Sequence, residues 1–165
     1  MTFAFLPMNI ILFDDQKREN LLPFSYTRPA CEIRVGIFTI REKWQNWLGE
    51  SASFHTEDYL SGKFPLKAEE DNLLVNGRFI PDLSLLNEVR SLSQGQQLEA
   101  DGQLIAARCS RKELEGFKGE ALQTKETRKA GQPALEIIHP FHIFQYNGDE
   151  IRRDFEWICK TRRSK

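Results

Sequence analysis

The chain has 165 residues, which is enough for one domain with a sizeable hydrophobic core and too few for two ordinary domains. Its formal net charge of -1 provides no general attraction for nucleic acid or an anionic membrane, so an anion site would need a local cluster of basic residues. Three widely spaced cysteines without a Cys-x-x-Cys pair argue against a zinc site or a disulfide framework, and they favour a reduced, cytoplasmic location.

The first apolar run, MTFAFLPMNIILF, is shorter than the roughly 20 apolar residues that a membrane span needs. It also lacks the basic start and the small-residue cleavage site of a signal peptide. We predict that residues 1–7 form a loosely attached extension and that residues 8–165 form a single domain. Within this domain, Asn9 to Phe13 is a short continuous apolar run, which is typical of a buried strand.

The next segments alternate between helix and strand. Apolar residues at helical spacing predict a helix that ends at Gly49. A short strand is expected over residues 52–56, followed by a helical turn with Thr56 as its cap. A third strand, residues 73–75, leads into a turn at Asn76-Gly77. The stripe that predicts the helix consists of Ile37, Ile40, Trp44, Trp47 and Leu48.

The second half of the chain has a different pattern. After a second helix over residues 81–92, residues 96–109 alternate as a β-hairpin with the preferred turn pair Asp101-Gly102 at its tip. The polar segment 115–133 is compatible with a loop, a surface helix or a flexible lid. Residues 135–147 are apolar and expected to be extended, and residues 148–160 are expected to form a final helix. This order of elements indicates an α/β layer fold with an added hairpin.

The segment after the first strand, residues 14–36, has the chemistry of an anion site. In open α/β sheets, ligands bind where loops leave the carboxyl ends of the strands. Two prolines restrict this loop and reduce the entropy that is lost when it orders. The alternative is a surface loop with scattered charges. The basic side chains of the segment are Lys17, Arg18, Arg28 and Arg34, and arginine suits bidentate contact with phosphate.

Two pairs of charged residues in this segment allow more than one interpretation. Asp14 and Asp15 at the end of the first strand could share Mg²⁺, or they could be solvated or capping carboxylates. Glu32 and Arg34 would project to the same side of an extended backbone, where they could form an ion pair that orients the loop or a catalytic pair.

Several motifs carry a resemblance to a known family. MNIILFDD, LLPFSYTRP and DNLLVNGRF resemble the opening of the sugar-phosphate nucleotidyltransferases, in which a first strand leads into a glycine-rich loop, Leu-x-Pro-Leu-Thr and Pro-Lys, and a later strand ends in Asn-Gly-Asp. Together with TIREKW, TEDYL and NGDEIRRDFE, they more closely resemble a divergent family of sugar nucleotidyltransferases. Its members are often fused to a left-handed β-helix, as in N-acetylglucosamine-1-phosphate uridylyltransferase-like proteins. The similarity extends from Met8 to about Arg163.

The resemblance implies a Rossmann-like, three-layer α/β fold of reduced size. It implies a nucleoside triphosphate and a sugar phosphate as partners, transfer of a nucleotidyl group to a sugar 1-phosphate with release of pyrophosphate, and Mg²⁺ as cofactor. It is also compatible with a homo-oligomer or a β-helix partner domain. We predict that Arg28 and Arg34 are catalytic. The predicted phosphate contacts are Lys17, Arg18, Arg28, Arg34, Asn76 and Arg78.

Three departures from the family pattern leave two functional classes open. No glycine lies between Asp14 and Val35, Ala30 replaces the lysine after proline, and Arg78 replaces the metal-binding aspartate. The domain is therefore either an enzyme whose arginines hold the phosphates, or a non-catalytic domain that binds a nucleotide sugar or serves in assembly. In the first case, Arg28 and Arg34 should line a shallow cleft with Asn76 and Arg78 opposite. In the second, the arginines should pair with Glu19, Glu32 or other nearby acids and hold the loops rigid.

Overall fold

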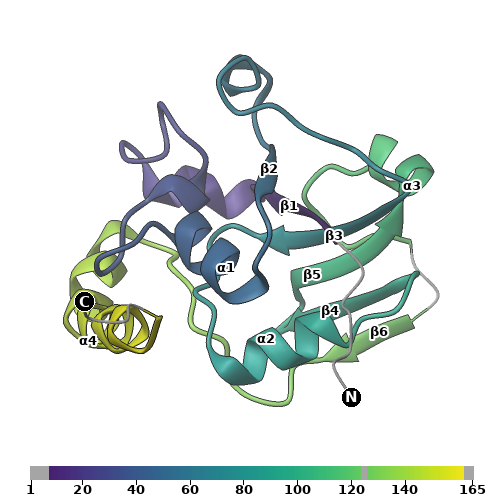
Figure 1. The fold of residues 1–165 in the computed structure, drawn as a ribbon. Coiled ribbons are helices and arrows are strands. Elements are labelled where there is room, and N and C mark those ends of the chain that lie inside the picture. Colours follow the sequence, from purple (N-terminus) through teal and green to yellow (C-terminus); the bar gives the residue numbers. More distant parts are fainter. Residues whose placement is uncertain (1–7, 124–125, 162–165) are drawn as a thin grey trace.

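A computed structural model of the chain describes residues 8–123 and 126–161, so the predicted extension over residues 1–7 lies outside the described residues. The described part is built on a six-stranded mixed sheet (Figure 1). From one edge to the other, the strands are β2 (Ala52–His55), β1 (Asn9–Phe13), β3 (Asp71–Asn76), β5 (Gln103–Ser110), β4 (Gln96–Ala100) and β6 (Glu126–Lys129). β1 is parallel to β2 and β3, β5 is antiparallel to β3 and β4, and β6 is parallel to β4.

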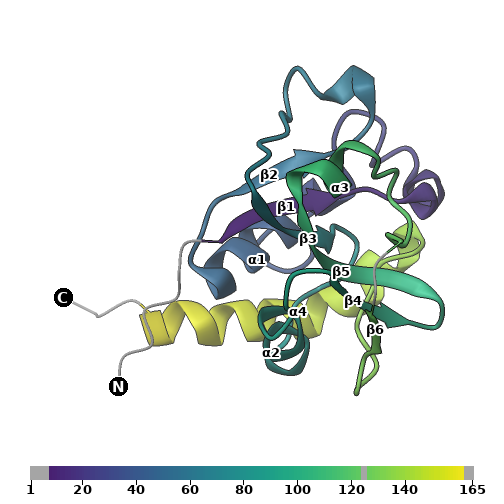
Figure 2. The same ribbon diagram turned by 90° about the vertical axis from the view of Figure 1, so that its right-hand side faces the viewer.

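Helices cover the two faces of the sheet unequally. The α-helices are α1 (Ile40–Leu48), α2 (Leu83–Arg90), α3 (Arg111–Glu115) and α4 (Pro140–Thr161), and short 3₁₀ helices span Gln16–Leu21, Ala30–Glu32 and Asp58–Leu60. Figure 2 shows α1, α2 and α4 on one face of the sheet and α3 on the other. The predicted α/β layer fold is confirmed, and the predicted hairpin forms β4 and β5.

β1, β3 and β5 are largely buried on both faces, as their apolar runs predict. Successive side chains of a strand point to opposite faces, so each of these three strands contributes to two separate hydrophobic clusters. The larger cluster lies against α1 and α2, and the smaller one lies against α3. Leu12, Leu73 and Val75 belong to the larger cluster, and Ile11, Phe13 and Leu74 belong to the smaller.

The ends of the helices follow from local sequence. Thr39 and Glu42 form a reciprocal capping box at the start of α1, and Gly49 ends the helix in a left-handed conformation with φ 79°. Asp82 caps α2 by accepting a hydrogen bond from the Leu85 N–H at 2.8 Å. The predicted helices therefore form, although Ile37 precedes α1 rather than belonging to it.

Two predictions over the second half are wrong or incomplete. Residues 140–147 are not extended but form the first turns of α4. Pro140 suits the first position of a helix, and the His142 ring nitrogen Nδ1 accepts the N–H groups of Ile138 and His139 at 3.0 and 3.1 Å. The polar segment 115–133 contains β6, a short, largely exposed strand whose sequence has no apolar alternation to predict it.

Candidate functional site

The site is set by the carboxyl ends of β1 and β3. The parallel register pairs Phe13 with Asn76, so the residues that follow the two strands emerge side by side at one edge of the sheet. The Gly77 N–H donates to the Phe13 carbonyl at 2.9 Å. A side chain at position 77 would lie 2.9 Å from Cys31 Cβ, so only glycine lets the Thr27–Cys31 segment pass this close to the Asn76-Gly77 turn.

Asp15 and Arg78 form a buried, two-pronged ion pair between these strand ends. Arg78 Nε donates to Asp15 Oδ1 at 2.8 Å, and its Nη2 donates to Oδ2 at 2.6 Å. Asn76 Nδ2 donates to the same Oδ2 at 2.8 Å. Burial acts to raise the pKa of Asp15, but the hydrogen bonds and charge of Arg78 outweigh it and lower that pKa below its ordinary value.

The remaining donors of Arg78 are also used. Its Nη1 donates to Glu136 Oε2 at 2.9 Å and to the Ile137 carbonyl at 3.2 Å, and the side chain has no exposed surface. Burial acts to lower the pKa of Arg78, but Asp15 and Glu136 reverse this effect and raise it. Arg78 therefore joins β1, β3 and the segment before α4, and it has no free donor directed at solvent.

Asp14 is held in a similar way on the other side of β1. Its carboxylate accepts the Ala30 N–H at 2.9 Å and the Thr56 hydroxyl at 2.5 Å, and it lies 3.2 Å from Arg18 Nε. Burial raises the pKa of Asp14 more than these partners lower it. Asp14 thus joins the Thr-Arg-Pro segment and β2 to the end of β1.

Arg18 belongs to the loop framework. Besides Asp14, its guanidinium contacts the Ser25 carbonyl and donates to the Tyr59 hydroxyl at 2.8 Å. The Tyr59 hydroxyl in turn donates to the Tyr26 carbonyl at 2.8 Å. Since Arg18 is buried among these partners, it fixes the path of residues 18–26.

The two aspartates do not fit a bound Mg²⁺ as they are arranged. Magnesium requires carboxylate and water oxygens that are free to point at the ion. Both oxygens of Asp14 and of Asp15 already accept hydrogen bonds from protein donors. In the part of the chain that the structure describes, no group of three or more His, Cys, Asp or Glu side chains could hold a metal ion. The Mg²⁺ site at Asp14 and Asp15 therefore stays a prediction, and the arrangement of these two carboxylates does not support it.

Arg28 and Arg34 lie in a different setting, on the outer side of the loop that follows β1. They line one pocket of about 440 Å³ between this loop and the start of α4. Arg28 is exposed and has no hydrogen-bond or ion-pair partner among the described residues. The Arg34 side chain is 59% exposed, contacts the Ile37 carbonyl and lies 3.9 Å from Glu42. The other residues lining this pocket are Pro23, Phe24, Thr27, Ile33, Ile143 and Phe144.

The predicted site residues therefore separate into two groups. Arg28 and Arg34 share a pocket, as expected, but Asn76 and Arg78 are fully buried and do not line it, so that part of the geometric prediction is wrong. Lys17 is exposed, and its side chain has no partner among the described residues. The alternative of arginines paired with nearby acids holds for Arg78, which lies beside Asp15 and Glu136, and more loosely for Arg34, which lies 3.9 Å from Glu42. Arg18 is paired with Asp14 in the same way. The binding roles of Lys17, Arg28 and Arg34 stay predictions.

Comparison with known proteins identifies the family. Residues 10–163 match a family described as sugar nucleotidyl transferase. The chain belongs to this family. A solved structure from Bacillus anthracis, of a protein assigned as a glucose-1-phosphate thymidylyltransferase and crystallised with sucrose, is 11% identical, with a TM-score of 0.50. The match covers 88% of this chain and 96% of that chain, and at this identity it shows a shared fold. No curated protein matches the sequence.

Some residues that build this nucleotidyltransferase domain were not predicted. Glu136 is the second carboxylate on Arg78, and it is the only acid in the apolar stretch 134–144, a pattern that indicates a buried charged partner. Thr56 was expected to cap a helical turn, but its hydroxyl donates to Asp14. Glu32 pairs with Arg41 rather than Arg34, because residues 30–32 form a 3₁₀ turn and not an extended segment.

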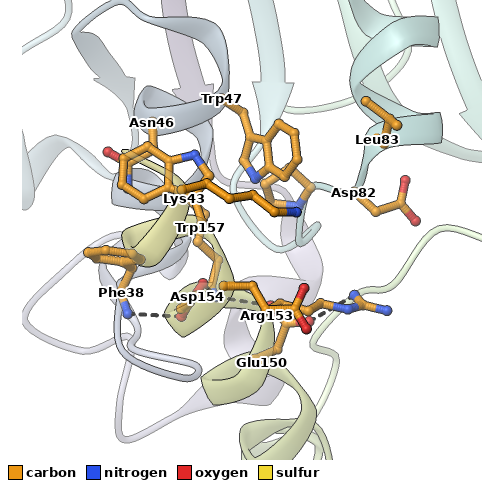
Figure 3. Close-up of a pocket in the computed structure, with 13 residues that line it drawn as sticks. Phe38, Lys43, Asn46, Trp47, Asp82, Leu83, Glu150, Arg153, Asp154 and Trp157 are labelled. Atoms are coloured by element: carbon orange, nitrogen blue, oxygen red, sulfur yellow. Dashed lines mark hydrogen bonds and ion pairs between the residues drawn. The ribbon is translucent and has the colours of Figure 1, made fainter. Parts of the chain in front are cut away.

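A second pocket of about 290 Å³ lies between α1, α4 and the start of α2 (Figure 3). Trp47, Trp157 and Phe38 contribute aromatic rings to its wall. Beside it, the buried Lys43 ammonium lies 2.9 Å from Glu150 and 2.5 Å from Asp154. Arg153 lies 2.9 Å from Glu150 and supplies a second positive charge, so two cations balance the two carboxylates, and we interpret the cluster as the anchor of α4. Along residues 8–123 and 126–161, no helix has the length and apolar character needed to cross a membrane.

Proposed function

We propose that this domain transfers a nucleotidyl group from a nucleoside triphosphate to a sugar 1-phosphate and releases pyrophosphate. The observation that carries the proposal is the family match over residues 10–163, combined with two exposed arginines in one pocket at the loop after β1. In this fold class, that loop is the place where ligands bind. Arg28 and Arg34 supply positive charge there, and within the described part of the chain the nearest carboxylate partner is Glu42, 3.9 Å from Arg34.

In the proposed reaction, an oxygen of the sugar phosphate attacks the α-phosphorus of the triphosphate. One phosphorus–oxygen bond forms, and the bond from the α-phosphorus to the leaving pyrophosphate breaks. The attacking phosphate is mostly ionised at pH 7, because its second pKa is about 6, so the step needs no general base. The protein's part is then to position the two anions and to stabilise negative charge.

Arg28 and Arg34 suit the task of positioning the phosphates because they present planar guanidinium donors to solvent. The guanidinium group can form two parallel hydrogen bonds to a phosphate, which fixes orientation as well as charge. Phe24 and Phe144 border the same pocket, and an aromatic ring offers a surface on which a nucleobase can stack. We assign the phosphate contacts to the two arginines, with Lys17 as a more distant attractive charge.

Mg²⁺ supplies charge neutralisation in reactions of this type, but no step here is assigned to it. Asp15 already accepts four hydrogen bonds, from the Arg78 and Asn76 side chains and the Lys17 N–H, so accepting a metal would require at least one of them to break. Asp14 directs its two oxygens at the Ala30 N–H and the Thr56 hydroxyl. A requirement for Mg²⁺ would therefore reflect an ion carried by the triphosphate.

A second function is favoured by one specific observation. Arg78 stands where the family's Asn-Gly-Asp motif has its metal-binding aspartate, and this arginine is buried in ion pairs with Asp15 and Glu136. A domain of this kind could bind a nucleotide sugar, or act in assembly, without turnover. The charged network would then stabilise the fold alone.

Turnover distinguishes the two functions. The protein is incubated with each of the four nucleoside triphosphates, a panel of sugar 1-phosphates and Mg²⁺, and pyrophosphate release is measured. Release that requires both substrates and falls in the Arg28→Ala variant supports the transferase. Nucleotide-sugar binding without release supports the second function. A protein that neither turns over nor binds any of these ligands contradicts both.

A further inference from the structure

The start of α4 is capped by a side chain that can take up a proton near neutral pH. His142 stands at the third position of the helix, and its Nδ1 accepts the N–H groups of Ile138 and His139 at 3.0 and 3.1 Å. An imidazole nitrogen that accepts a hydrogen bond carries no proton itself. The arrangement therefore requires a neutral ring with its proton on Nε2.

In two other helices of the chain, a carboxylate fills the same position. At the start of α1, Glu42 accepts the Thr39 N–H at 2.7 Å. At the start of α3, Glu113 accepts the Ser110 N–H at 2.8 Å. A carboxylate ordinarily stays ionised down to about pH 4, whereas histidine ordinarily changes charge between pH 5 and 8. Of these three caps, the one on α4 is therefore the one expected to respond to pH near neutrality.

The charges around His142 do not favour a protonated ring. The first turn of α4 contains no acid, and the positive end of the helix dipole disfavours a cation there. The nearest acids along the chain, Glu136 and Asp149, are each already paired with an arginine. On the facing loop, Arg28 and Arg34 line the pocket that the start of α4 borders, so the charge on that side is positive as well.

Three rings pack against His142 and hold its orientation. Tyr146 stacks on it with the ring planes 3° apart and the centroids 5.5 Å apart, and the centroids of Phe141 and His139 lie at 4.4 and 5.8 Å. His139 is exposed and would add a second positive charge in acid. Protonation of Nδ1 would therefore point a new N–H at two N–H groups that have lost their acceptor.

The capped segment lies between two fixed points. Before it, the Ile137 N–H donates to the Arg78 carbonyl at 2.9 Å. After it, Asn147 Oδ1 accepts the Gly36 N–H at 2.9 Å, and Glu150 is buried against α1. Between these points, residues 138–146 are held by the cap and by apolar side chains that pack against the larger cluster. Loss of the cap should therefore loosen the first turn and leave the rest of α4 in place.

We propose that His142 is a pH-dependent positioning residue for the pocket that Arg28 and Arg34 line. Its neutral ring holds the first turn of α4, and with it Phe144, at the wall of this pocket, and protonation releases the turn. The stabilisation of the turn is complete above the pH range in which histidine ordinarily takes up a proton, and it is lost as the pH falls through that range. The role of the pocket rests on the proposed function, whereas the cap does not.

NMR of the whole chain tests the cap. The ¹⁵N shifts of the His142 ring report which nitrogen carries the proton, and at pH 7.5 we expect it on Nε2. The ¹³C backbone shifts of residues 140–146 should be helical at pH 7.5 and should move towards coil values by pH 5.5. His142→Gln keeps an acceptor that does not titrate, so it should stay helical at both pH values, and His139→Gln should behave as the wild type. A proton on Nδ1 at pH 7.5, a wild-type turn that is helical at both pH values, or the same loss in His142→Gln overturns the proposal.

Triphosphate binding tests the positioning role. The phosphates of the ligand also take up protons between pH 7.5 and pH 5.5, so the wild type is compared with His142→Gln under the same conditions. The wild type should lose at least about threefold more affinity than the variant, which is the scale of one lost hydrogen bond. An equal loss in the two proteins overturns the positioning role. Absence of binding at both pH values would contradict the proposed function, and the NMR result would then decide whether His142 controls the start of α4.

Discussion

Two groups of arginines lie after neighbouring strands and have opposite surroundings: Arg28 and Arg34 follow β1, and Arg78 follows β3. Arg78 is fully buried, and Asp15 and Glu136 compensate its charge and accept three of its hydrogen bonds. Arg28 and Arg34 are exposed and line one pocket, and among the residues that the structure describes their only carboxylate partner is Glu42, 3.9 Å from Arg34. A buried, paired guanidinium serves the fold, because separating it from its carboxylates leaves uncompensated charge. An exposed guanidinium, such as Arg28 or the loosely paired Arg34, remains available to a ligand phosphate.

This contrast also explains how the loop after β1 is held without a glycine-rich turn. Asp14 and Asp15 take the place of a compact backbone turn by accepting hydrogen bonds from three other segments. The loop is thus fixed from its inner side, and its outer side is left to present Arg28 and Arg34. The following predictions test this division of roles.

Arg78→Ala should have the largest effect, on stability. Removing the guanidinium leaves Asp15 and Glu136 without their buried partner, and the free energy of unfolding should fall by about 3–5 kcal/mol. Denaturant unfolding followed by circular dichroism measures this difference. The double variant Arg78→Met/Asp15→Leu, which removes both charges, should recover part of the loss. A loss below about 1 kcal/mol would mean that Arg78 is not held as described.

Asp15→Asn should lower stability at neutral pH, by roughly 1.5–3 kcal/mol for each charge-assisted hydrogen bond that is lost. The pKa of Asp15 is lower in the folded protein than its ordinary value of 3.8. Its stabilising contribution is therefore complete above that value and is lost as the pH falls through the lower folded pKa. The free energy of unfolding of the wild type and of Asp15→Asn is measured between pH 7 and pH 2. The difference between the two proteins should become smaller only below about pH 4. A difference that does not change with pH would contradict the ion pair.

Arg28→Ala and Arg34→Ala should each weaken nucleoside triphosphate binding by about 1.5–3 kcal/mol, the scale of a charge-assisted hydrogen bond. Their unfolding free energies should stay within about 0.5 kcal/mol of the wild type, because neither side chain is buried. Calorimetric titration and denaturant unfolding of the same preparations give both values. Arg28→Lys is the matched control, and it should retain part of the binding because it keeps charge but not the planar donor pair. If these variants lose stability but not triphosphate binding, Arg28 and Arg34 serve the fold and not the ligand, which would contradict the proposed division of roles.

Lys17→Ala should have the smallest effect. Its side chain is exposed and has no partner within residues 8–123 and 126–161, so stability should change by less than about 0.5 kcal/mol. If Lys17 contributes only a long-range attraction, its effect on triphosphate binding should disappear at high salt, where the Debye length falls to about 3 Å. Titrations at low and high ionic strength measure this. An effect that persists at high salt would indicate direct contact.

Local sequence was sufficient to predict the central strands and the first two helices. The apolar run of β1, the Gly49 stop and the Asp101-Gly102 turn each have a physical cause within a few residues, and each is found in the structure. The start of α4 was missed because apolar residues before and after Pro140 have no clear period. The pairing of β6 with β4 was missed because polar residues on an exposed edge strand leave no hydrophobic pattern.

The candidate site was only partly predictable, because its decisive feature is which charges meet. Arg28, Arg34 and Arg78 are equivalent in the sequence as basic residues near strand ends. Their separation depends on contacts across long stretches of chain, such as Arg78 with Glu136. Spacing along the chain indicates which residues can lie at the same edge of a sheet. It does not indicate which of the arginines at that edge will be buried in ion pairs and which will stay exposed.

The central claim is that exposed Arg28 and Arg34, and not buried Arg78, meet the phosphates. Its most direct test is calorimetric titration of the wild type and of the double variant Arg28→Ala/Arg34→Ala with the four nucleoside triphosphates, with and without Mg²⁺. The account predicts that the wild type binds at least one triphosphate and that the folded double variant binds it at least tenfold more weakly, at about 1.4 kcal/mol per tenfold. Equal binding by the two proteins, or binding of no triphosphate by the wild type, would contradict it.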